Sequence, residues 1–119
     1  MMKFPSFLQP DAMDCGSTCL KMLTKYYGKE YSLDTLRSLC YTTKEGVSLL
    51  SISEAAEQIG FKTVGGRISF DKLEKDALLP CIVHWNQEHF VVVYKIKSKN
   101  LFRTQSIVYI ADPAHGKVK

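Results

Sequence analysis

The sequence predicts an α+β domain in which a helical N-terminal half packs on an antiparallel sheet formed by the C-terminal half. Two observations carry this prediction. Apolar residues recur with helical spacing in three segments before residue 61, whereas the second half holds short runs rich in β-branched residues. The connections between those runs are short, which favours an antiparallel meander. A cleft between the two layers would then be the natural place for a site.

The helical half is expected to contain three helices. The first starts at Cys15 and stops at Gly28, the second covers residues 32–40 with Ser32 as its cap, and the third runs from about residue 49 to residue 59. Their apolar faces are, in order, Cys19, Met22, Leu23, Tyr26 and Tyr27; Leu33, Leu36, Leu39 and Cys40; and Leu49, Ile52, Ala55, Ala56 and Ile59.

The second half changes its period. Residues 61–64 are a short strand candidate, and residues 70–75 a single helical turn before Pro80. Three strands follow in the meander. They are residues 81–85, 89–96 and 106–111, joined by a tight connection at 86–88 and by a loop that begins with the basic stretch 97–100.

Length and composition fit one domain, residues 1–119, with a core that needs no disulfides. The net charge of +4 comes from dispersed basic residues, so nucleic acid is not indicated as a partner. No apolar stretch is long enough to cross a bilayer, and the N-terminus lacks a secretory signal. We therefore expect a domain that is cytosolic or faces the cytosol, with its four cysteines reduced.

Cys15 is the candidate nucleophile. It follows the polar loop 9–14 and is expected in the first turn of a helix, capped by Asp11 or Asp14, where the helix dipole favours an anion. A thiolate is the reactive form of cysteine and is favoured there. Gln9 lies just upstream, where its amide could donate to an oxyanion beside the sulfur. An inert, buried cysteine is the alternative for this position.

His89 and Asp112 are the candidate partners of the cysteine. In a meander the start of the middle strand and the end of the next strand share one edge of the sheet, so the two residues are expected side by side. A carboxylate beside an imidazole orients the ring and stabilises the imidazolium. His84 is the rival base, expected to point into packing, and His115 is the weakest candidate.

A metal site is the competing interpretation of the cysteines and histidines. Cys15 and Cys19 on one helical face, with His84 and His89, come closest to a ligand set, but the spacing matches no familiar zinc pattern. We therefore expect neither a metal nor another cofactor in this domain.

Three separated motifs resemble the N-terminal cysteine peptidase domain of peptide-exporting, bacteriocin-processing ABC transporters. They are residues 9–16 (QPDAMDCG), residues 84–85 with 89–93 (HW and HFVVV), and residues 111–113 (ADP) followed by Gly116. The resemblance spans nearly the whole chain, and the motifs occur in the family's order. Ser17 and Thr18 stand where small residues such as alanine are often found, which leaves the mechanism untouched.

The resemblance implies a papain-like cysteine endopeptidase that removes leader peptides after a double-glycine site. Cys15 would be the nucleophile, His89 the general base, Asp112 the orienting acid and Gln9 the oxyanion donor. The implied partners are a leader peptide and the membrane-spanning and ATPase parts of a transporter. ATP and Mg²⁺ would serve only that whole protein, at the cytoplasmic side of the bacterial membrane. Since family members continue beyond this point, the chain would be a piece of a transporter or a free-standing relative.

Other functions remain open at this level. A peptide-binding domain without catalysis would recruit cargo to a transporter and use the same groove. An acyltransferase or transglutaminase of papain-like fold would use the same three residues for transfer.

Overall fold

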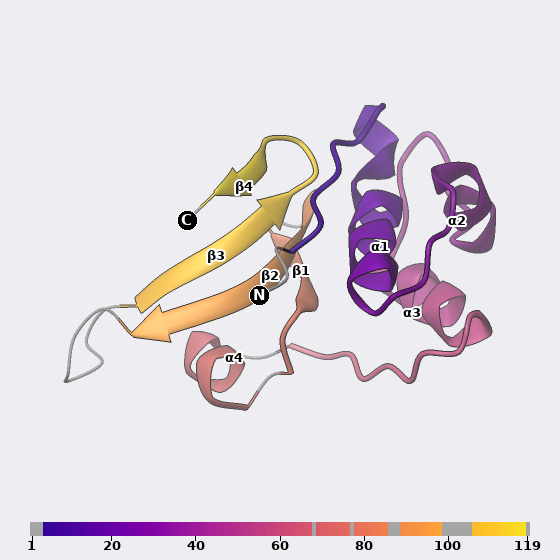
Figure 1. The fold of residues 1–119 in the computed structure, drawn as a ribbon. Helices are drawn as coiled ribbons and strands as arrows, with labels where there is room; N and C mark the ends of the chain where they lie inside the picture. The colour runs from indigo at the N-terminus through magenta and orange to yellow at the C-terminus, as the bar shows by residue number, and fades with distance from the viewer. Residues whose placement is uncertain (1–3, 68, 77, 86–88, 99–105, 119) are drawn as a thin grey trace.

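A computed structural model describes residues 4–67, 69–76, 78–85, 89–98 and 106–118. The helical half and the sheet lie side by side, as predicted (Figure 1). The 3₁₀ turn η1 (Ala12–Asp14) leads into α1 (Cys15–Tyr26), followed by α2 (Leu33–Leu39), α3 (Leu49–Gln58) and α4 (Phe70–Asp76). The strands are β1 (Cys81–Trp85), β2 (His89–Ser98), β3 (Ser106–Asp112) and β4 (Gly116–Val118).

The three helices of the first half, α1 to α3, begin and end within two residues of the positions that the sequence indicates. The Ser32 hydroxyl caps α2 by accepting a hydrogen bond from the Thr35 backbone N–H at 3.2 Å. The chain leaves α1 at Gly28 and α3 at Gly60, whose φ angles of 87° and 103° strongly favour glycine. Local capping and stop signals therefore confirm the predicted helices.

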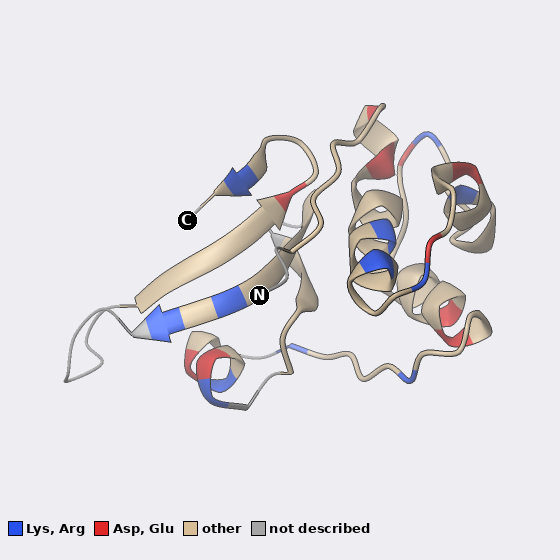
Figure 2. Ribbon diagram, in the orientation of Figure 1, with Lys and Arg blue, Asp and Glu red and all other residues tan. Residues whose placement is uncertain are grey.

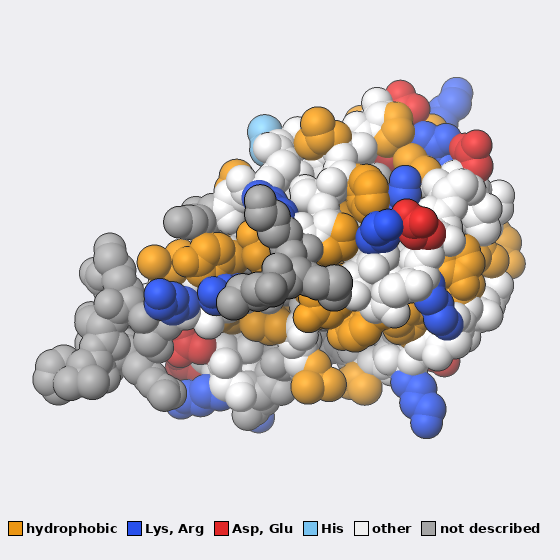
Figure 3. All heavy atoms as spheres, viewed as in Figure 1, with side chains coloured by type: hydrophobic (Ala, Val, Ile, Leu, Met, Phe, Trp, Pro, Cys, Tyr) orange, Lys and Arg blue, Asp and Glu red, His pale blue; other side chains and the backbone are white. Residues whose placement is uncertain are grey.

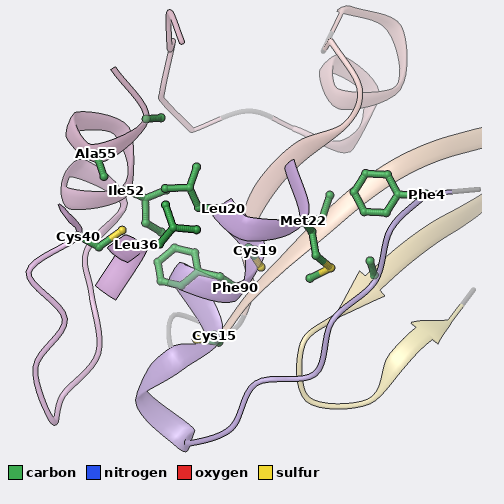
Figure 4. Close-up of a cluster of buried hydrophobic side chains, with 13 residues drawn as sticks. Phe4, Cys15, Cys19, Leu20, Met22, Leu36, Cys40, Ile52, Ala55 and Phe90 are labelled. Carbon is green, nitrogen blue, oxygen red and sulfur yellow. The ribbon is translucent and has the colours of Figure 1, made fainter. Parts of the chain in front are cut away.

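Helix α1 lies at the centre of the core because it contacts α2 and α3 on one side and β2 on the other. Figure 4 shows Leu36, Ile52 and Ala55 on the first of these sides, with Met22 and Phe4 on the other. Two expected core residues are wrong. Tyr27 is 54% exposed, because it is the cap residue after the last turn of α1 rather than part of its buried face. Leu49, the first residue of α3, is 37% exposed.

The sheet is an antiparallel meander in the order β1-β2-β3-β4. The register places Trp85 opposite His89, and Val92 opposite Ala111. Strand β2 is longer than predicted, because Lys97 and Ser98 are paired with β3 rather than lying in a loop. The expected connection at 86–88 and the rest of the expected loop at 99–100 fall outside the described residues.

Two further elements differ from the expectation. Strand β4 is too short for its three residues to carry an alternating pattern, so the sequence did not indicate it. Residues 61–64 form no strand: Val64 is fully exposed, and the Thr63 hydroxyl instead donates a hydrogen bond to Glu57 at 2.7 Å. The β-branched composition of that segment has no neighbouring strand to pair with among the described residues.

Charged residues in the described part of the chain are dispersed rather than gathered in one place. Lysine and arginine are spread over the helices and the sheet, with acidic residues between them (Figure 2). Hydrophobic side chains show in several separate areas of the face drawn in Figure 3. Within the described ranges, no helix is both long and apolar enough to cross a membrane.

Candidate active site

Cys15 is the first residue of α1 and is buried at the end of the helix that meets the sheet (Figure 4). Cys15 borders a pocket of about 350 Å³. The lining residues come from the loop before α1, the loop before α3 and the first two strands: Ala12, Cys15, Glu45, Gly46, Val47, His84 and Phe90. The predicted start of the helix and the predicted cleft between the layers are therefore both present.

The expected cap of α1 is not formed by a side chain. Asp14 occupies the cap position, but its carboxylate turns away from the helix and binds Arg37 of α2. Asp11 is the cap residue of η1, the turn that leads directly into α1, and forms a capping box with Asp14, in which its backbone N–H donates to Asp14 Oδ2 at 3.2 Å. Capping of α1 by the Asp14 side chain was therefore wrong, whereas Asp11 caps the turn from which the helix starts.

His89 and Asp112 lie side by side, as the meander predicts. His89 Nε2 is 2.6 Å from Asp112 Oδ1, and His115 Nδ1 is 3.1 Å from Asp112 Oδ2. The Ala114 backbone N–H also donates to Asp112 Oδ1, at 2.8 Å. Burial alone would raise the pKa of Asp112, but the hydrogen bonds from His89, Ala114 and His115 outweigh it and hold the pKa below its ordinary value of 3.8. Asp112 is therefore an anion at neutral pH, bound to the His89 ring.

The contact of His89 Nε2 with Asp112 determines which nitrogen of the His89 ring carries the proton. An aspartate anion accepts a hydrogen bond, so His89 Nε2 carries the proton that Asp112 binds. In a neutral ring Nδ1 is then the nitrogen that can accept a proton.

Cys19 lies one turn after Cys15 on α1 and is fully buried. Burial raises the pKa of the Cys19 thiol well above its ordinary value, and the charge of Asp112 raises it further. Helix α1 contacts strand β2, which pairs with β3. Cys19 itself stays a neutral, buried thiol.

Gln9 lies where the N-terminal segment meets the turn after β3. Its backbone N–H donates to the Pro113 carbonyl at 2.7 Å, directly after Asp112. Its side-chain Nε2 donates to the carbonyls of Asp11 and Ala12 at 2.9 and 3.3 Å. Gln9 is thus tied to both the loop before Cys15 and the carboxylate end of the site, and its amide hydrogens are engaged within that loop.

His84 does not point into packing as expected. It is exposed, it lines the pocket with Cys15, and its ring stacks on Phe90 with centroids 4.3 Å apart. The register explains this position, because His84 is the cross-strand partner of Phe90 on strand β1 at the sheet edge. No described carboxylate binds His84, whereas His89 has Asp112.

Arg37 is the site residue that the sequence did not indicate. In the sequence Arg37 is only a polar residue on a short helix, and nothing in the spacing connects it to Asp14, which lies 23 positions earlier.

The four cysteines are all free. Among the described residues, no group of three or more His, Cys, Asp or Glu side chains is placed to hold a metal ion.

Comparison with known proteins defines the class to which this fold and site belong. A mixed fold of this kind occurs in a solved double glycine motif protease from an AMS/PCAT transporter, in complex with the leader peptide: 38% identity, a TM-score of 0.89, and coverage of 98% of this chain and 79% of that one. The peptidase domain of Streptococcus ComA, described as a bi-functional ABC transporter involved in a quorum sensing pathway, gives 34% identity, a TM-score of 0.79, and coverage of 98% and 85%. The papain-like fold expected from the resemblance is thereby confirmed.

The Peptidase C39 family model matches residues 3–119, so the chain belongs to the Peptidase C39 family. The lactococcin-G-processing and transport ATP-binding protein LagD of Lactococcus lactis is 37% identical over 116 residues, which cover 93% of this chain. The probable microcin-H47 secretion/processing ATP-binding protein MchF of Escherichia coli is 34% identical over 97% of this chain. The matched region spans only 16% and 15% of the length of these two relatives.

Proposed function

We propose that this domain is a cysteine endopeptidase that cuts peptide precursors after a double-glycine leader. In this proposal Cys15 is the nucleophile, His89 the general base and acid, Asp112 the orienting carboxylate, and Gln9 an oxyanion donor. The observation that carries it is the 2.6 Å contact between His89 Nε2 and Asp112 Oδ1 at the end of the sheet where α1 begins. Family membership and the double-glycine protease neighbour support the same class of reaction.

Acylation begins with transfer of the Cys15 proton to His89 Nδ1. The thiolate attacks the carbonyl carbon of the second leader glycine, and the carbonyl electrons move to its oxygen. When the oxyanion collapses, the carbon–nitrogen bond breaks and the His89 imidazolium protonates the leaving amine. A thioester between the leader and Cys15 remains.

Deacylation uses the same groups in reverse. Neutral His89 removes a proton from a water molecule, and the resulting hydroxide attacks the thioester carbon. The carbon–sulfur bond breaks, and the His89 imidazolium returns its proton to the departing Cys15 sulfur. The leader leaves as a carboxylic acid, which loses its proton to solvent. Asp112 keeps the ring oriented throughout and stabilises each imidazolium that forms.

Oxyanion stabilisation requires a small change at Gln9. The longer of its two amide hydrogen bonds, 3.3 Å to the Ala12 carbonyl, is the one it would release to donate to the substrate oxygen. The Cys15 backbone N–H is the second donor, and the dipole of α1 favours the same negative charge.

The pocket beside Cys15 suits a glycine pair. Gly46, Val47 and Ala12 bound it at close range, so a substrate backbone without side chains can approach the sulfur. Glycines offer no side chain to hold, so affinity must come from the rest of the leader, for which an amphipathic helix on an apolar groove is the expected anchor.

The relatives suggest the setting of this activity. Their names describe processing and transport ATP-binding proteins, so we propose that the domain acts at the cytoplasmic side of a membrane transporter. ATP and Mg²⁺ would then be needed by the ATPase part and not by the cleavage step.

A synthetic leader peptide with a double-glycine junction tests the proposal. In reducing buffer, mass spectrometry should find hydrolysis after the second glycine, and Cys15→Ala should abolish it. Cys19→Ala and Cys81→Ala are matched controls that remove other thiols, and both should still cut.

Other results would support the rival functions. Tight binding of the leader by the unaltered protein without any cut would make this a recruiting domain. Transfer of the leader to an added amine in place of hydrolysis would make it an acyltransferase. Cleavage that survives Cys15→Ala, or that requires zinc found by elemental analysis, would refute the proposed nucleophile.

A further inference from the structure

Arg37 and Asp14 form a two-pronged ion pair directly before the cysteine. Arg37 Nε donates to Asp14 Oδ1 at 2.8 Å, and Arg37 Nη2 donates to Asp14 Oδ2 at 2.6 Å. The Asp14 side chain is 0% exposed, while that of Arg37 is 29% exposed. The guanidinium hydrogen bonds lower the pKa of Asp14, against the effect of burial, so this pair is charged at neutral pH.

The ion pair also fixes the loop that carries Gln9. Asp14 Oδ2 accepts the Asp11 backbone N–H at 3.2 Å, and Arg37 Nη2 lies 3.7 Å from Asp11 Oδ2. The Asp11 carbonyl in turn accepts the Gln9 amide at 2.9 Å. A continuous set of contacts therefore runs from α2, through Asp14 and Asp11, to the residue upstream of the cysteine.

We propose that Arg37 is a positioning residue that holds Cys15 and Gln9 in their reactive arrangement and neutralises the charge of Asp14 beside the thiolate. This inference rests on the proposed function, in which Cys15 is the nucleophile. Arg37 touches neither the pocket lining nor the His89 and Asp112 pair, so it acts through Asp14.

The electrostatic role proposed for Arg37 follows from the position of Asp14. A buried carboxylate one residue before the cysteine disfavours a second negative charge there unless a cation compensates it. The other ionisable groups around Cys15 are Glu45 and His84 at the pocket, Cys19 and Asp112 behind it, and His89, the proposed base, which Asp112 binds. None of them is a permanent cation, so Arg37 is the cation that balances Asp14.

The positioning role proposed for Arg37 follows from the geometry of its guanidinium group. Its planar fork binds both oxygens of Asp14 at once, which a lysine ammonium does not reproduce. A displacement of about 1 Å at a reacting group costs about 100-fold in rate. Lysine at this position should therefore restore the charge but not the full rate.

The test compares Arg37→Gln and Arg37→Lys in leader cleavage and in alkylation of Cys15 by iodoacetamide as a function of pH, with Cys19→Ala as background. For Arg37→Gln we expect kcat to fall about 10- to 100-fold with KM nearly unchanged. Its alkylation profile should move to higher pH by about one unit, as for one added neighbouring charge. Arg37→Lys should restore the alkylation profile while kcat stays below that of the unaltered protein.

Asp34→Asn is the matched control, because Asp34 binds the same arginine through Nη1 at 3.0 Å but is 89% exposed and does not contact Asp14. It should leave both readouts unchanged. If Arg37→Gln fails to fold by circular dichroism, Asp14→Asn is measured instead. It removes the buried charge together with the need for its partner, so kcat should fall without a shift of the alkylation profile to higher pH.

The outcomes separate this inference from the proposed function. A folded Arg37→Gln variant with normal kcat and a normal alkylation profile overturns the role of Arg37 and leaves Cys15 as nucleophile. If the alkylation profile of Asp14→Asn moves to higher pH by as much as that of Arg37→Gln, the proposal that Arg37 balances the charge of Asp14 is overturned. Retained cleavage in Cys15→Ala overturns the proposed function itself.

Discussion

Asp112 holds His89 by a 2.6 Å contact between Oδ1 and Nε2, although 23 positions separate the two residues in the chain. The contact arises because β2 starts where β3 ends, so the antiparallel pairing of these strands brings both residues to one end of the sheet. The aspartate thereby selects the ring nitrogen that remains available for proton transfer. Three predictions concern this pair and the pocket beside it, and a fourth concerns folding in acid.

His89→Ala should reduce kcat for leader cleavage about 100- to 10,000-fold, because it removes the proposed general base and acid. His84→Ala should keep most of kcat and raise KM, because His84 lines the pocket but has no described carboxylate partner. Steady-state kinetics of both variants makes the comparison. If His89→Ala and His84→Ala both lose turnover completely, the choice of His89 over His84 as the base is unfounded.

Asp112→Asn should fold normally and lose about 100-fold or more in kcat, because an amide can bind the ring without stabilising the imidazolium. The Ala114 backbone N–H and His115 both bind the same carboxylate, so a modest loss of thermal stability is expected as well. Kinetics below the melting temperature separates the two effects. Undiminished kcat would remove Asp112 from the mechanism.

Gly16→Ala should destabilise the fold by about 1–3 kcal/mol, because the site is already filled. An added Cβ would lie 2.4 Å from Val47 Cγ2 and 3.0 Å from Ile52 Cδ1. Val47 also borders the pocket, so cleavage should slow as it moves.

Gly65→Ala is the control for this substitution, since no heavy atom lies within 4 Å of its added Cβ. Its free energy of unfolding should change by no more than about 0.5 kcal/mol. Urea denaturation measures both variants. A stable Gly16→Ala protein would mean that the loop carrying Val47 yields easily.

Acid should destabilise the domain below about pH 4. The pKa values of Asp14 and Asp112 are both lower in the folded protein than their ordinary value of 3.8. Their contribution to stability is therefore complete above that value and is lost as the pH falls through the folded pKa values. Urea unfolding at pH 7, 5, 4 and 3 follows the loss.

The variant Asp14→Asn isolates one of these groups. It should be less stable than the unaltered protein at pH 7 but lose less additional stability between pH 5 and pH 3. Asp34→Asn, an exposed partner of the same arginine, should follow the unaltered protein at every pH. If Asp14→Asn keeps the full acid dependence, other carboxylates cause it.

The sequence predicted those features that depend on local pattern or on simple topology. The caps at Ser32, the stops at Gly28 and Gly60, and the order of the strands all follow from residues within one element or its neighbour. The pairing of His89 with Asp112 needed only the assumption of a meander.

Other features depend on contacts between distant side chains. The sequence predicts Asp14 as a helix cap, but the bidentate ion pair of the buried Asp14 carboxylate with Arg37 outweighs a cap that water could replace. His84 reads as a core residue in an apolar run, yet strand β1 lies at the sheet edge, where this position faces a pocket. Neither fact can be derived from spacing, because each depends on where a second element packs.

The backbone hydrogen bond from Gln9 to the Pro113 carbonyl joins the first and last portions of the chain. During translation the cysteine leaves the ribosome long before the aspartate and the proline do. Until those late residues have been synthesised and folded back, Cys15 lacks the His89 and Asp112 pair proposed as its partner, and its entry loop lacks the anchor at Pro113. Under the proposed function, the nascent chain is therefore expected to cut no peptide before the end of the sheet has folded.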